Sequence, residues 1–245
     1  MSSLTSSLVE VHIVHKGNEH YAKGRKLAEN VYRQVWGTKN LLDGNDYGVI
    51  VSHNGKVLGN INIQFRRSRD LLKSEVFFGE RHWQEYSDAQ PSQIAELSAL
   101  ALAQDVPKQL RRPTMMTLIL GIYLICHAEN IKFVATVQHD YLIRILSKSL
   151  HLPFFRNEYV KHIYGEVPND NYWNRGKLPR LYYFLPNSLH TINACASFIT
   201  RLPKTKIVKS DFPVIKPDSL LDRSTFPEHW DKVKNYNFAN FAYAS

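Results

Sequence analysis

The chain has 245 residues, 44% of them hydrophobic, and a formal net charge of +9. This length and hydrophobic content support one large folded domain or two small ones, and they exclude a disordered chain. The positive charge suits an acidic partner such as nucleic acid, anionic lipid or an acidic protein, and general solubility explains it equally well.

The two cysteines and the apolar stretches indicate the cellular compartment. Cys126 and Cys195 lie in apolar surroundings without Cys-x-x-Cys spacing, which predicts buried free thiols in a reducing cytosol. Residues 1–7 lack the basic and apolar regions of a signal peptide, and the longest apolar stretch, 115–126, is too short to span a bilayer. We therefore expect a cytoplasmic protein with no integral membrane segment.

The first part of the chain has the patterns of a strand, a helix and a hairpin. Leu8–Val14 is a weakly alternating, β-branched segment typical of a strand. Glu19–Trp36 carries apolar residues at helical spacing, and a glycine follows it. Strands Tyr47–Ser52 and Val57–Phe65 are joined by a loop containing Asn-Gly, the strongest short hairpin signal.

The segment Gln93–Ala103 is apolar except for two polar positions inside it, Glu96 and Ser98. Its composition favours a helix by propensity. The loop, long apolar helix and short strand that follow it favour a buried parallel strand feeding a crossover helix. As a strand, the segment places Glu96 and Ser98 on one face. A carboxylate buried there must be paired, protonated or functional.

The remaining segments predict alternating helices and strands, and irregular chain beyond Pro203. They are a buried helix Thr114–Glu129, a strand Lys132–Val137, an amphipathic helix His139–His151, strands Tyr159–Gly165 and Arg180–Leu185, and a helix Leu189–Ile199. This order predicts an α/β (α+β) fold in which a mixed, twisted central sheet is flanked by helices.

That order of elements resembles the GNAT acyltransferase fold, and short motifs narrow the resemblance. They are Arg25, Tyr32 and Trp36 in the first helix, Asp43 and Asp46 before the second strand, Gly59 with Arg66 and Arg67 in and after the third strand, and Glu96 with Ser98. Over about residues 8 to 185 the chain looks like the acyl-homoserine-lactone (autoinducer) synthases and the related N-acyl amino acid synthases. Ala99 stands where those families usually carry Arg, which favours the N-acyl amino acid branch or a divergent member.

The resemblance implies a bacterial N-acyltransferase that moves a fatty acyl group from an acyl carrier protein to the amine of an amino-acid-like acceptor. It also implies a GNAT-like domain at residues 1–187, with a C-terminal helical or irregular extension at 188–245 packed on it. No bound cofactor is expected, because acyl-phosphopantetheine or acyl-coenzyme A serves as a substrate.

The same resemblance implies roles for individual side chains. Glu96 would assist deprotonation of the attacking amine, directly or through water, and Ser98 would hydrogen-bond the substrate. The implied substrate-binding residues are Arg25, Tyr32, Trp36, Asp46, Arg66 and Arg67.

Plainer interpretations of these residues stay open. Glu96 could be a structural carboxylate paired with Arg66 or Arg67, and Ser98 could cap a backbone group. Asp43 suits a turn, and aromatic residues four apart, such as Tyr32 and Trp36, are usually core.

The predicted loop Gln104–Pro113 bears on the acyl donor. It has no glycine, and its two prolines lack N–H donors, so it serves the pyrophosphate of coenzyme A poorly. Lys108, Arg111 and Arg112 instead suit the acidic surface of an acyl carrier protein. An ordinary basic loop is the alternative interpretation.

The helix Thr114–Glu129 is apolar almost all round, more than one core-facing stripe requires. In a GNAT-like sheet the strand of Glu96 and the strand that follows this helix diverge, and the acyl thioester inserts between them. Leu100, Leu118 and Ile122 are therefore candidates for the acyl pocket. The alternative is a central helix covered by the C-terminal segment.

Two other functions remain in competition. A coenzyme A-dependent GNAT N-acetyltransferase of a small amine is the main alternative. A nucleic-acid-binding protein is less well supported, because the basic residues are dispersed and no binding motif appears. The histidines do not fall at metal-ligand spacing, so we predict no metal site.

Overall fold

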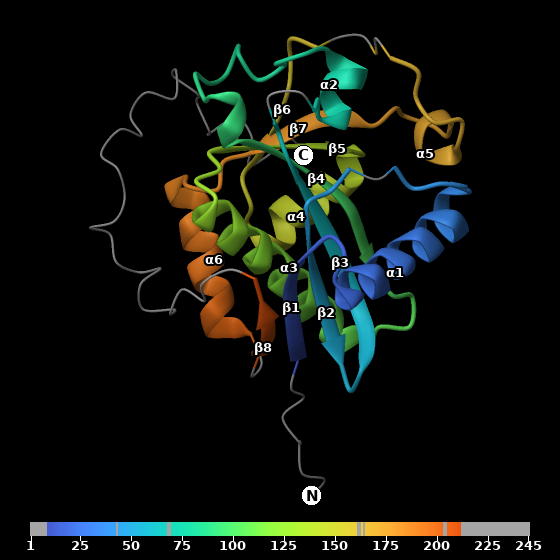
Figure 1. Ribbon diagram of the computed structural model, residues 1–245, viewed down its shortest axis with the longest axis vertical. Coiled ribbons are helices and arrows are strands. Elements are labelled where there is room, and N and C mark those ends of the chain that lie inside the picture. The colour runs from blue at the N-terminus through green and yellow to red at the C-terminus, as the bar shows by residue number, and fades with distance from the viewer. Residues whose placement is uncertain are drawn as a thin grey trace, which may run out of the picture.

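The computed structural model describes residues 9–42, 44–67, 70–160, 163, 165–202 and 205–211. Eight strands form one mixed sheet in the order β6-β7-β5-β4-β3-β2-β1-β8, with helices on both faces (Figure 1). The strands are β1 (Val9–His15), β2 (Tyr47–His53), β3 (Lys56–Phe65), β4 (Ile94–Leu102), β5 (Phe133–Gln138), β6 (Phe154–Arg156), β7 (Arg180–Phe184) and β8 (Thr205–Ser210). The helices are α1 (Glu19–Trp36), α2 (Lys73–Phe78), α3 (Lys108–Ala128), α4 (Asp140–Leu150), α5 (Asn171–Asn174) and α6 (Leu189–Arg201), with a 3₁₀ turn at Pro91–Gln93.

Because side chains alternate along each strand, two separate hydrophobic cores form, one on each face of the sheet. On one face, Val134 of β5 and Tyr182 of β7 join the large core beneath α3, α4 and α6. On the other face, Phe133 and Tyr183 from the same strands pack with Phe77 of α2. The mixed, helix-covered sheet predicted from the sequence is therefore confirmed.

Local signals explain the precise limits of α1. Asn18 caps the helix by accepting a hydrogen bond from the backbone of His20 at 2.9 Å, and Gly37 ends it in the left-handed conformation. Within the helix, Gly24 lets α1 approach β3 closely, because a Cβ atom there would lie 2.4 Å from Oδ1 of Asn60. This contact fixes α1 tightly against the sheet.

A β-bulge in β4 changes which side chains share a face. The β3–β4 register shifts opposite Asn60–Asn62, since β4 carries one extra residue there, and Ala99 adopts a positive φ of 54°. Beyond the bulge the alternation is inverted. Leu100 packs into the core beneath α3, whereas Ala101 packs against Ala28 of α1.

The parallel strands β4 and β5 separate part-way along their length. They pair from Ile94 with Phe133 to Leu97 with Thr136, and no pairing follows, although both strands continue. The divergence that the sequence analysis expected between these strands is confirmed.

Three elements differ from the sequence predictions. Helix α3 begins at Lys108 rather than at Thr114, since Lys, Gln, Leu and Arg are good helix formers and Leu110 is buried. The closing strand is β6 rather than Tyr159–Gly165, because Phe154 and Phe155 fill the cores on opposite faces of the sheet.

The third difference is β8, which pairs in parallel with β1 where irregular chain was expected. The predicted C-terminal extension beyond residue 211, and Asp43, lie outside the described residues.

Helix α3 lies between the sheet and α6, and Cys195 and Phe198 of α6 belong to the same core as Leu118. This arrangement matches the interpretation of α3 as a central helix covered by the C-terminal segment. Cys126 and Cys195 are buried and free, as predicted. In the part of the chain that the structure describes, no helix is long and apolar enough to cross a bilayer.

Candidate active site

A cavity of about 90 Å³ lies on the α1 and α2 side of the sheet, where β4 and β5 separate. Its walls come from α1 and the following loop (Tyr32, Thr38, Asn40, Leu41, Leu42), α2 (Lys73, Phe77), β4 (Glu96, Leu97, Ser98, Ala99), β5 (Val137, Gln138) and the region around α5 (Pro168, Asp170, Tyr172, Trp173).

A second hollow of about 550 Å³ runs along the outside of α1 and is wide open to solvent. It contains none of the residues of the β4–β5 separation. The smaller cavity is the better candidate site, because it joins that separation to a buried carboxylate.

Glu96 is the central side chain of this cavity, and it is 4% exposed. Its Oε2 accepts two hydrogen bonds from Ser74 of α2, one from the backbone N–H at 2.8 Å and one from the hydroxyl at 2.5 Å. Burial raises the pKa of Glu96, and the two bonds from Ser74 act in the opposite direction. Its Oε1 accepts no hydrogen bond from the described residues, so it is free to act toward the cavity.

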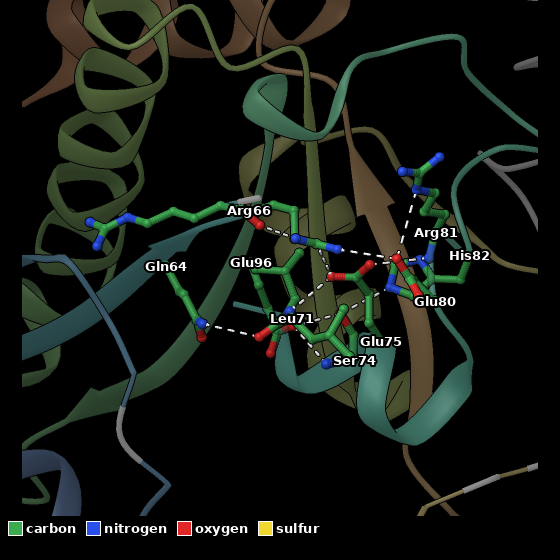
Figure 2. Close-up of polar contacts among 11 residues, drawn as sticks. Gln64, Arg66, Leu71, Ser74, Glu75, Glu80, Arg81, His82 and Glu96 are labelled. Atoms are coloured by element: carbon green, nitrogen blue, oxygen red, sulfur yellow. Dashed lines mark hydrogen bonds and ion pairs between the residues drawn. The ribbon is translucent and has the colours of Figure 1, made fainter. Parts of the chain in front are cut away.

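Ser74 connects Glu96 to a deeper buried cluster (Figure 2). The hydroxyl of Ser74 lies 2.9 Å from Nε2 of His82, whose Nδ1 lies 2.7 Å from the hydroxyl of Tyr183. Asn157 donates through Nδ2 to that hydroxyl at 2.7 Å. Burial lowers the pKa of His82 to about 3, so its imidazole is neutral.

Arg66 does not pair with Glu96. Its Nε lies 2.6 Å from Oε2 of Glu75, both side chains are buried, and Nη2 reaches Glu80 at 3.4 Å (Figure 2). Glu75 also accepts from the backbone of Leu72, which begins α2. Among the described residues no cation forms an ion pair with Glu96, so the interpretation of Glu96 as the partner of Arg66 or Arg67 is wrong.

Asp46 and Arg67, both predicted to bind substrate, form an ion pair with each other. Asp46 also accepts from the backbone N–H of Phe65 at 2.7 Å and so holds the end of β3. Neither side chain lines the cavity, and the Arg67 side chain is 60% exposed. The structure therefore brings these two residues together outside the cavity.

Arg25 is buried and holds the loop after α1. Its Nη2 donates to the carbonyl oxygens of Leu41 at 2.5 Å and Leu42 at 2.9 Å, and its Nε reaches Glu29 at 3.4 Å. Leu41 and Leu42 line the cavity, but Arg25 does not. The observed role of Arg25 is thus to support the cavity wall.

Ser98 lines the cavity beside Glu96, and its hydroxyl donates to Oδ1 of Asn45 at 2.6 Å. The strand prediction that placed Ser98 and Glu96 on one face is confirmed. Nδ2 of Asn45 is buried and has no hydrogen-bond partner among the described residues, and Asn45 itself does not line the cavity.

Aromatic side chains form the wall opposite β4. Tyr32 lines the cavity, and burial raises its pKa to about 12. Its ring lies 6.3 Å from that of Tyr172, whose hydroxyl donates to the carbonyl of Val137 at 2.7 Å. Trp36 lies behind this wall, stacked on His139 at 5.1 Å, and does not reach the cavity.

Among the cavity and support residues that the sequence analysis missed are Lys73, Ser74, Asp170 and Tyr172. Asp170 accepts from Thr38 at 2.8 Å and joins the two loops that close the cavity. Lys73 lines the cavity and donates to the carbonyl of Leu42 at 2.7 Å. All four lie in irregular or short segments, where no periodic pattern could have found them.

The structure does not place the three predicted acyl-pocket residues at the cavity. Leu118 and Ile122 of α3 are fully buried in the core on the opposite face of the sheet. Leu100 faces that same core, because the bulge at Ala99 inverts the alternation that would have grouped it with Glu96 and Ser98.

Lys108, Arg111 and Arg112 lie exposed on the first turns of α3 rather than in a loop. Arg111 donates to the carbonyl of Val106 at 3.2 Å, and Arg112 to that of Ser149 at 3.0 Å. The loop from β4 to α3 is only five residues long, 103–107, and it remains free of glycine. Within the described ranges, no group of three metal-ligating side chains occurs.

The sheet with its separating strands β4 and β5 has a GNAT-like fold, and comparison with solved structures confirms this fold. The crystal structure of the acyl-homoserine lactone synthase LasI aligns with a TM-score of 0.56 and 15% identity over 77% of this chain and 95% of LasI. The coenzyme A-dependent acyl-homoserine lactone synthase BjaI, with SAM and isopentyl-CoA, aligns with a TM-score of 0.55 and 12% identity over 86% and 97% of the two chains.

FeeM, an N-acyl amino acid synthase from uncultured soil microbes, aligns with a TM-score of 0.50 and 14% identity over 76% of this chain and 96% of FeeM. No protein-family profile and no curated protein sequence matches the chain. At these identities the likeness shows the fold that this chain shares with both kinds of synthase.

Proposed function

We propose that this protein is an N-acyltransferase that moves an acyl group from a thioester to the amine of an amino-acid-like acceptor. The observation that carries the proposal is a buried carboxylate, Glu96, that forms no ion pair with any residue the structure describes, in a cavity where β4 and β5 separate. A carboxylate held in this way has the raised pKa and the free oxygen that a general base needs.

The chemistry assigned to the cavity is deprotonation followed by acyl transfer. Oε1 of Glu96 takes a proton from the acceptor ammonium, directly or through water, because only the neutral amine is a nucleophile. The amine nitrogen then attacks the thioester carbonyl, the C–N bond forms, the C–S bond breaks, and the departing thiolate takes the second nitrogen proton. The proton on Glu96 returns to solvent.

The polar rim of the cavity suits an acceptor that carries both charges of an amino acid. Lys73 can bind a carboxylate, while Glu96 and Asp170 attract an ammonium group. The volume of about 90 Å³ is below the roughly 300–1,000 Å³ of pockets that enclose drug-sized ligands, so the cavity is too small for a long acyl chain. We therefore assign the cavity to the reacting ends, and the acyl chain to the separation between β4 and β5.

We further propose that an acyl carrier protein delivers a fatty acyl group. The support is the exposed cluster of Lys108, Arg111 and Arg112 beside the glycine-free turn from β4 to α3. The second candidate is transfer from acyl-coenzyme A. It is favoured by the helical start of α3 at Lys108, because a helix N-terminus binds phosphate well, and by the coenzyme A-dependent synthase BjaI among the similar structures.

A donor and acceptor screen tests the proposal. The purified protein is incubated with acyl-carrier and acyl-coenzyme A thioesters of matched chain lengths and a mixture of amino acids, with free thiol and N-acyl products measured. We expect thiol release with a matching N-acyl product, and a loss of roughly 10²–10⁴-fold for Glu96→Gln. Folded protein that releases no thiol from any donor would refute the proposed function.

A further inference from the structure

The buried cluster behind Glu96 has a defined direction of hydrogen bonding. The Tyr183 hydroxyl lies 2.7 Å from Nδ1 of His82 and 3.0 Å from the His82 carbonyl oxygen, and its single proton can be donated to only one of them. Asn157 donates both to the Tyr183 oxygen and to the His82 carbonyl, at 2.7 and 3.0 Å. The Ser74 hydroxyl has one proton and donates it to Oε2 of Glu96, so Nε2 of the neutral His82 ring is the donor to Ser74, and Nδ1 is the acceptor from Tyr183.

The neutral imidazole of His82 then carries its proton on Nε2. That N–H donates to the Ser74 oxygen at 2.9 Å, and the Ser74 hydroxyl in turn donates to Oε2 of Glu96 at 2.5 Å. Every donor in the series points toward the carboxylate. Such a series polarises along its length and strengthens the last bond.

We propose that Tyr183, His82 and Ser74 form a directed hydrogen-bond chain that keeps the Glu96 carboxylate ionised and its Oε1 turned to the cavity. The proposal concerns positioning residues, since Glu96 alone of the four reaches the cavity. It rests on the proposed function only in assigning Glu96 as the base for the acceptor amine.

The hydrogen-bond chain opposes the effect of burial on the protonation of Glu96. Burial alone favours the protonated acid, which cannot accept a proton. Two donors from Ser74 on one oxygen favour the ionised form and leave the other oxygen for the substrate. The charged and titratable groups around Glu96 are Lys73 and Glu75 of α2, Tyr172 of α5 and, on the cavity wall, Tyr32 and Asp170.

Ser74→Ala tests the chain through the pH dependence of activity. Loss of the hydroxyl donor raises the pKa of Glu96, so the acidic limb of kcat/KM moves up by about one pH unit. Activity at pH values on the acidic limb falls by up to about tenfold and recovers above the limb, with an unchanged KM for the acceptor. Ser74→Thr keeps the hydroxyl and restores the profile.

Tyr86→Phe is the matched control for Tyr183→Phe. Both tyrosines are buried, their rings lie 5.5 Å apart, and both hydroxyls contact Asn157, but only Tyr183 contacts His82 through its hydroxyl. Tyr183→Phe should move the acidic limb in the same direction by less than Ser74→Ala, whereas Tyr86→Phe should leave it in place. An equal fall in activity at every pH with an unmoved limb would show a purely structural role and overturn the proposal.

A second readout does not depend on acyl transfer. Nitrogen NMR of the His82 ring, assigned by its loss in His82→Gln, should show a neutral Nε2–H imidazole from pH 5 to pH 9. An Nδ1–H tautomer, or protonation of the ring within that range, would overturn the proposed hydrogen-bond chain even if the enzyme is active. If no donor is turned over, this measurement still decides the chain while the assay rejects the proposed function.

Discussion

Arg66 forms its ion pair with Glu75, at 2.6 Å between Nε and Oε2, and both side chains are almost completely buried. The pair fixes the first turn of α2, because Glu75 also accepts from the backbone of Leu72. Ser74 lies in the same turn, so the pair also positions the two donors that hold Glu96. An arginine predicted to bind substrate thus acts one step behind the cavity.

We expect Arg66→Met to destabilise the protein by about 3–5 kcal/mol, since it leaves Glu75 buried without its partner. The double variant with Glu75→Gln should recover part of that loss. Arg67→Met is the matched control and should cost less than about 1 kcal/mol, because the Arg67 side chain in its ion pair with Asp46 is 60% exposed. Urea denaturation measures all three, and equal losses for the two arginines would contradict the buried pair.

Glu96→Gln should change how stability depends on pH. The pKa of Glu96 is raised by burial, so between its unfolded value of about 4.3 and its folded value the native state binds the proton more tightly. The contribution of Glu96 to the free energy of unfolding is therefore fully present below its unfolded pKa, and it is lost as the pH rises through the folded pKa. Relative to the wild type, the variant should gain unfolding free energy across that window, and parallel curves for the two proteins would reject the raised pKa.

Arg25→Met should loosen the loop that follows α1 rather than abolish binding directly. Loss of its bonds to the carbonyls of Leu41 and Leu42 should cost about 1.5–3 kcal/mol in chemical denaturation. Amide exchange in residues 38–42 should also become faster. Lys26→Met, on the exposed side of the same helix, should change neither quantity. Normal stability with a raised KM for the acceptor would instead support the substrate-binding role implied by the sequence.

The sequence predicted elements whose signals are local. The limits of α1 follow from Asn18 and Gly37, and the hairpin follows from Asn54 and Gly55, which both adopt positive φ. The strand around Glu96 was recognisable from the elements that follow it, although propensity favoured a helix.

What the sequence could not show depends on contacts between distant residues. His82 meets Tyr183 across 101 positions, and β8 pairs with β1 at the far end of the chain. The bulge at Ala99 has no sequence signal, because alanine rarely adopts positive φ, and it alone moved Leu100 to the other face.

Leu118→Trp should behave as a core substitution. Leu118 is fully buried beneath the sheet, and its Cδ1 lies 3.0 Å from where a Cβ atom of residue 59 would be. Overpacking there should cost about 1–3 kcal/mol and leave the preferred acyl length unchanged. Val137→Ala, at the separation of β4 and β5, should extend the preferred length by contrast. A shortened acyl product from a folded Leu118→Trp variant would return the acyl pocket to α3.

The final prediction concerns the donor. Changing Lys108, Arg111 and Arg112 together to Glu should raise KM for an acidic acyl carrier protein by about tenfold or more, because steering acts on the charge of the partner. A short acyl-pantetheine donor carries no acidic surface, so its KM should change little. The same charge change on the exposed face of α1, at Lys23, Lys26 and Arg33, controls for net charge and should leave both donors unaffected. If acyl-coenzyme A is used as well as the carrier, and both lose affinity equally in the α3 variant, the cluster binds phosphate rather than a carrier surface.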